Sequence, residues 1–121
     1  MTDLPKEYRI RELIAEARNK ISGLHNAYVG PILEMLERVV SVLDTPTSKR
    51  NQVVLLLSVA TRHMKRVEGM VIDAILGKEW ISQQDEAVFV RVRLLCYEII
   101  ALLTSASDNL RLVPVPVDRY F

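Results

Sequence analysis

The longest unbroken pattern of hydrophobic and polar positions in this chain runs from Asn51 to Gly77. It contains no proline and one internal glycine, and its apolar residues recur at steps of three and four, which is typical of a core-facing helix. We expect a helix that begins near Ser48, ends before Gly77 and measures about 40 Å at roughly 1.5 Å per residue. The polar side carries Ser58, Arg62, Lys65, Arg66 and Asp73, and the apolar side carries Leu56, Ala60, Met64, Val67, Val71, Ala74 and Ile75.

Two shorter amphipathic patterns precede this helix. The first covers residues 6–24, and Thr2 or Asp3 can cap it. The second runs from Pro31 to Leu43, with the proline in its first turn, where a missing N–H is tolerated. The polar residues 44–48 then lead into the long helix.

A fourth helix is predicted from Gln83 to about Thr104. Ser82 and Asp85 have the spacing of a capping box, with aspartate in place of the usual glutamate. Before it, we expect Trp80 and Ile81 to lie back on the core. Residues 105–109 are predicted to form a turn, and the tail that follows has two prolines, which allow an edge strand or an extended segment.

These elements predict an all-α fold, a four-helix bundle with a long central third helix and a short extended C-terminal tail. The composition agrees, because half of the residues are hydrophobic but only 6% are aromatic. We divide the chain into a helical interaction domain, residues 1–109, and an extended tail or the start of a truncated β-domain, residues 110–121.

Charge and cysteine content narrow the classes of function. The net charge is +1, whereas a dedicated nucleic-acid-binding module usually has a clear basic excess, so we expect weak or no direct nucleic-acid binding. The single Cys96 and the lack of a secretory signal predict a cytoplasmic protein, or a nuclear one in a eukaryote. The longest apolar runs are too short to cross a membrane.

The fourth helix has more apolar surface than a bundle requires. Residues 94–103 are apolar nearly all round, and so is the start of the third helix, residues 53–57. Such a segment is either central in the core or buried by another subunit, and the C-terminal tail could also cover it. We predict a homo-oligomer, or pairing with a homologous subunit, through an interface that includes Val53, Leu56, Leu57, Trp80, Leu95, Ile99, Leu102 and Leu103.

A basic patch of Arg62, Lys65 and Arg66 lies on the polar side of the third helix. Charged surface residues usually serve only to solvate a helix. The alternative is a patch that contacts phosphate or an acidic partner.

No catalytic, cofactor-binding or metal-binding motif is recognisable, so we predict a protein that is not an enzyme. The one pattern that hints at catalysis is Arg18 followed by His25, which resembles the Arg-x4-6-His signature of HEPN-type ribonucleases. Many unrelated chains satisfy this pattern. A HEPN-like ribonuclease is therefore kept as an alternative.

The chain resembles the helical domain of the GINS family in three segments. They are Tyr28-Val-Gly-Pro-Ile-Leu-Glu-Met-Leu at the second helix, Arg62-His-Met-Lys65-Arg66-Val67 leading to Asp73-Ala-Ile-Leu-Gly77 in the third, and Ile81-Ser-Gln-Gln-Asp-Glu86 at the start of the fourth. The resemblance implies a non-catalytic scaffold that bridges components of the replicative DNA helicase. GINS subunits usually add a small β-rich domain, of which only the tail could be the start. A small helical subunit of an RNA-guided or toxin–antitoxin complex is a further alternative.

Overall fold

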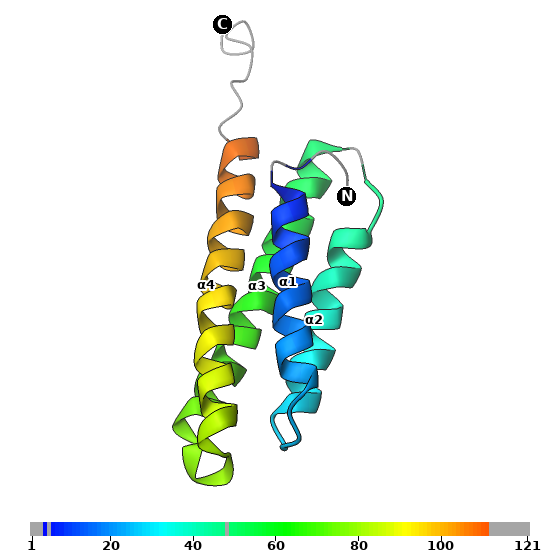
Figure 1. Ribbon diagram of the computed structural model, residues 1–121. Helices are drawn as coiled ribbons and strands as arrows, with labels where there is room; N and C mark the ends of the chain where they lie inside the picture. The colour runs from blue at the N-terminus through cyan, green and yellow to red at the C-terminus, as the bar shows by residue number, and fades with distance from the viewer. Residues whose placement is uncertain (1–3, 5, 48, 112–121) are drawn as a thin grey trace, which may run out of the picture.

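The computed structural model describes residues 4, 6–47 and 49–111. Within them the chain forms four α-helices and no strand, so the prediction of an all-α helical bundle is confirmed. The helices run alternately up and down (Figure 1). The elements are α1 (Glu7–Ser22), α2 (Val29–Asp44), α3 (Arg50–Leu76), a 3-10 turn η1 (Lys78–Trp80) and α4 (Gln83–Arg111).

Each helix packs mainly against two others, and helices that are consecutive in the chain are neighbours in the bundle. Contacts join α1 to α2, α2 to α3 and α3 to α4, and α1 closes the bundle against α4. The pairs α1 with α3 and α2 with α4 are therefore diagonal. At 1.5 Å per residue, the 27 residues of α3 and the 29 of α4 make helices of roughly 40 Å, against roughly 24 Å for α1 and α2.

The core is aliphatic, as the composition predicts. Ile10, Leu36, Val67 and Ile99, from four different helices, are fully buried in one continuous cluster. Phe89 is also fully buried, and the ring of Tyr28 meets it edge-on, with centroids 6.4 Å apart and an angle of 80° between the planes. The loop before α2 is thereby attached to the start of α4.

The start of α4 confirms part of the predicted capping box. The Ser82 hydroxyl accepts a hydrogen bond from the backbone N–H of Asp85 at 3.0 Å. The Asp85 carboxylate instead accepts a hydrogen bond of 2.9 Å from the Asn26 side chain, in the loop between α1 and α2. The cap therefore also connects two loops at the same end of the bundle.

The predicted end of α4 near Thr104 was wrong, since the helix continues to Arg111. Residues 105–109 include serine, aspartate and asparagine, which favour turns in isolation. Ala106 and Ser107 are buried against the bundle, and this tertiary packing overrides the weak local preference. The rest of the predicted tail, 112–121, lies outside the described residues, as do the predicted caps Thr2 and Asp3.

The predicted position of Trp80 was also wrong. Its side chain is 80% exposed at the end of η1, whereas Ile81 packs on the core as predicted. Trp80 is the last residue of η1 and Ile81 is the extended residue that follows it, so the chain changes direction between them and Ile81 is the one that packs inward.

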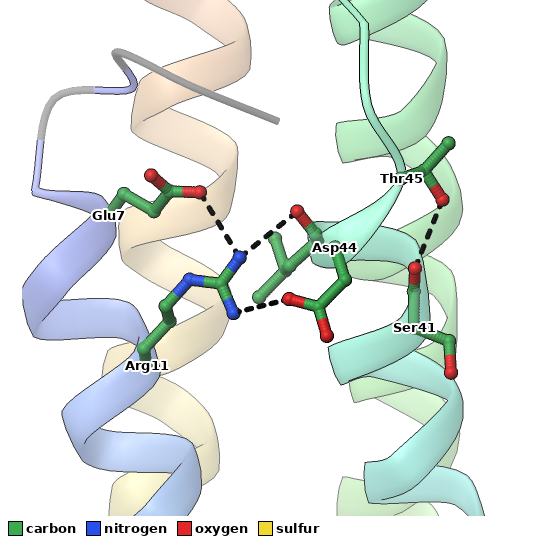
Figure 2. A network of polar contacts seen from close by, with 6 residues as sticks. Glu7, Arg11, Ser41, Asp44 and Thr45 are labelled. Atoms are coloured by element: carbon green, nitrogen blue, oxygen red, sulfur yellow. Dashed lines mark hydrogen bonds and ion pairs between the residues drawn. The ribbon is translucent and has the colours of Figure 1, made fainter.

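Arg11 of α1 binds the end of α2 (Figure 2). Its guanidinium donates to the Asp44 carboxylate at 2.8 Å and to the Leu43 carbonyl at 3.0 Å, and it pairs with Glu7 at 3.4 Å. The Leu43 carbonyl belongs to the last turn of α2, where carbonyls have no partner within the helix. Arg11 therefore caps α2 from a neighbouring helix.

Candidate interaction surfaces

The predicted interface residues divide into buried and exposed groups. Leu56 and Leu102 are partly buried against the core, and Trp80 is exposed. The other five are covered by the chain's own helices, namely Val53, Leu57, Leu95, Ile99 and Leu103. Most of the predicted interface is therefore core, and an interface on α4 needs other residues of that helix.

The outward side of α4 carries a second line of apolar residues. Val90, Leu94 and Tyr97 are 45%, 55% and 48% exposed, and Ala87 and Ala101 extend the line at the same steps of three and four. We call these five residues the α4 stripe. The helix is thus apolar on two sides, one of which fills the core while the other faces outward.

Charged residues flank the α4 stripe. Arg91 pairs with Glu16 of α1 at 3.7 Å, and Glu98 pairs with Arg9 of α1 at 3.2 Å. On the other flank, Arg93 lies over the Tyr97 ring, 5.5 Å from its centroid, and donates to its hydroxyl at 3.0 Å. Arg93 therefore holds the largest side chain of the α4 stripe in place.

The predicted basic patch is exposed on α3. Among the residues that the structure describes, none of Arg62, Lys65 and Arg66 forms an ion pair. Other arginines of the bundle do pair with carboxylates, namely Arg9, Arg11, Arg18, Arg38 and Arg91. The patch is therefore a local excess of positive charge in a chain that is nearly neutral.

A hollow lies on each side of this patch, and Arg62 lines both. The smaller, of about 310 Å³, lies between α3 and α4 and includes Ser58, Lys65 and Asp108. The larger, of about 560 Å³, lies between α2 and α3. We call the larger one the α2–α3 groove; it is lined by Pro31, Glu34, Met35, Arg38, Arg62, His63, Arg66 and Met70.

The two residues of the HEPN-like pattern, and the single cysteine, lie in three different surroundings. Arg18 forms an ion pair with Glu37 of α2, and His25 is exposed in the loop after α1. Cys96 is buried, and burial, together with the negative charge of Glu68, raises the pKa of its thiol to about 12. A thiol in that environment is a poor nucleophile, because the thiolate is the reactive form.

Residues 4, 6–47 and 49–111 contain neither a metal-binding cluster nor a membrane-spanning helix. Over those residues, no three His, Cys, Asp or Glu side chains come together in a way that could hold a metal ion. None of the helices described is both long and apolar enough to cross a membrane.

Comparison with known proteins gives no family for the chain. No family model, no curated protein and no solved structure matches it. The resemblance to the GINS helical domain therefore stays a prediction from the sequence.

Proposed function

We propose that the chain is a non-catalytic subunit that assembles with a second copy of itself, or with a homologous helical chain, through the α4 stripe. The observation that carries this proposal is the exposure of Val90, Leu94 and Tyr97 in one line on a helix whose opposite side already fills the core. A contiguous apolar patch rimmed by charged residues is typical of a protein interface.

The charges beside the α4 stripe favour a partner of the same kind. A stripe with steps of three and four places Glu86 and Arg93 on one flank and Arg91 and Glu98 on the other. In a parallel pair, residue 86 of one copy faces residue 91 of the other, and residue 93 faces residue 98. In an antiparallel pair, residue 91 faces residue 98. All of these pairs have opposite charges, so the surface is complementary to itself.

The assembly to which such a subunit belongs is proposed from the sequence resemblance alone. A GINS-like role would make the chain a scaffold between components of the replicative DNA helicase. An exposed apolar helix face suits that role, and it equally suits a simple homodimer, so the stripe supports assembly in general.

The size of the effect follows from the exposure of Leu94. Complete burial of a leucine side chain contributes about 1.5–3 kcal/mol, and roughly half of that remains available here. A symmetric dimer uses the residue twice, so Leu94 contributes about 2 kcal/mol, or roughly a 30-fold change in Kd. Leu94→Glu removes this contribution and adds two like charges at the interface.

The test is sedimentation equilibrium over a wide range of protein concentration. We expect the wild type to associate and Leu94→Glu to stay monomeric. Leu55→Glu is the matched control, because Leu55 is 63% exposed on α3, away from the stripe, and its variant should associate like the wild type. A monomeric wild type at high concentration, or equal loss of association in the two variants, would contradict the proposal.

A further inference from the structure

We propose that the α2–α3 groove binds an acidic peptide segment that carries an apolar side chain. The groove lies on another side of the bundle from the α4 stripe, because α2 is diagonal to α4. Binding in the groove is therefore a separate activity, and it does not depend on assembly through α4.

The charge of the groove calls for a negative ligand. Three arginines and one glutamate line it, an excess of two positive charges (3 − 1). Glu34 accepts from Arg38 at 3.2 Å within α2, so the carboxylate of the groove is already paired. Arg62 and Arg66 have no carboxylate partner among the described residues. Arginine presents a planar fork of N–H groups that matches a carboxylate, so an aspartate or glutamate of a ligand can bind both residues.

The floor of the groove calls for an apolar group as well. Met35 is buried and Met70 partly buried, and Pro31 lies with them along the groove. Methionine side chains adapt their shape to different apolar partners. At about 560 Å³ the space is within the usual range of ligand sites, which suits one or two side chains of a peptide and not a folded domain.

A peptide suits this surface better than a nucleic acid. Binding of single strands usually relies on aromatic side chains on which bases stack, and the described residues that line the groove include no phenylalanine, tyrosine or tryptophan. The combination of unpaired arginines and methionines therefore favours acidic residues next to an aliphatic or aromatic one.

The test uses fluorescence anisotropy with a labelled peptide of about ten residues in which aspartate and leucine alternate. We expect the wild-type protein to bind it, with affinity that falls as salt is added. Two control peptides change one property each: asparagine replaces aspartate, or alanine replaces leucine. Each should bind at least about tenfold more weakly, since the groove uses both charge and apolar contact.

Protein variants locate the site. Arg62→Gln with Arg66→Gln should weaken binding at least about tenfold. The matched control is Lys49→Gln with Arg50→Gln, which removes the same charge from the exposed start of α3, and its affinity should stay within about threefold of the wild type. Leu94→Glu should bind the peptide like the wild type, which separates this activity from assembly through the α4 stripe.

Several results would overturn the proposal. The first is that the wild-type protein does not bind the peptide, and the second is that the two double variants lose affinity equally. The third is that the wild type binds the alanine peptide as tightly as the leucine peptide, a comparison that needs no variant of the protein. Tighter binding of a labelled oligothymidine than of the acidic peptide would assign the patch to nucleic acid instead.

Discussion

Gly77 directly follows α3, and Tyr28, in the loop between α1 and α2, lies against it. A Cβ atom at this position would overlap the Tyr28 hydroxyl and would lie 3.2 Å from both the Tyr28 Cζ and the Asp73 carbonyl oxygen. The backbone at Gly77 has a φ of −84°, which any residue can adopt. The change Gly77→Ala therefore tests steric contact alone, without backbone strain.

The expected loss of stability combines two opposing effects. Tyr28 must move to admit the methyl group, and it then gives up its edge-on contact with Phe89, which is worth about 0.5–1.5 kcal/mol. Forcing an extra carbon into a packed site typically costs about 1–3 kcal/mol. Alanine also reduces the conformational freedom of the unfolded chain, which returns about 0.4–1 kcal/mol. We expect a net loss of about 2 kcal/mol in the free energy of unfolding.

The chain offers a matched control in the same helix. Gly69 lies inside α3, is exposed, and has no atom within 4 Å of an added Cβ. Since alanine is favoured over glycine inside a helix by about 1 kcal/mol, Gly69→Ala should stabilise the protein. The same substitution is thus expected to have opposite signs at the two positions.

Urea unfolding followed by circular dichroism measures both effects. All variants should carry Leu94→Glu and be compared at one concentration, because association would otherwise add to the apparent stability. Adding Tyr28→Phe to Gly77→Ala removes the atom nearest to the new methyl group and should recover about half of the loss, a coupling that a double-mutant cycle isolates. If Gly77→Ala is as stable as its parent, the loop does not lie against Gly77 in this way.

Two further predictions concern the Arg18–His25 pattern and the Cys96 thiol. Purified protein should leave RNA uncut, since Arg18 is engaged by Glu37; RNA cleavage that is lost in both Arg18→Ala and His25→Ala would contradict this. Native Cys96 should resist iodoacetamide at pH 8 and react when the chain is unfolded, as followed by mass spectrometry, and rapid labelling of the native protein would contradict its burial. Because its pKa rises from 9.0 to about 12 on folding, the thiol's contribution to stability is complete below pH 9 and declines as the pH rises from there toward 12.

The sequence predicts the helices better than it predicts their outward surfaces. The period of three to four residues locates α3 within two residues of its observed start, because that pattern reports burial along the helix itself. In α4 the pattern fails to separate Leu94, which is exposed, from Leu95, which is buried, since both are apolar neighbours. Their difference depends on the rotation of α4 against α1 and α3, which no local pattern records.

The surface charges show the same limit. Arg62 and Arg66 are correctly predicted to share one side of α3. That they line a groove together with Arg38 and two methionines depends on how α2 lies beside α3. The basic patch could therefore be found from the sequence, but the apolar half of the proposed binding site could not.

The closing of the bundle by α1 and α4 has a consequence for the kinetics of folding. The other three helix pairs join neighbours in the chain, so most contacts are local, and a topology of that kind folds fast. The α1–α4 pair must instead bring together segments separated by two intervening helices, and it carries the largest entropy of loop closure. We therefore expect its exposed ion pairs, Arg9 with Glu98 and Glu16 with Arg91, to form after the rate-limiting step. Interactions formed that late slow the opening of the native protein and leave the rate of folding nearly unchanged.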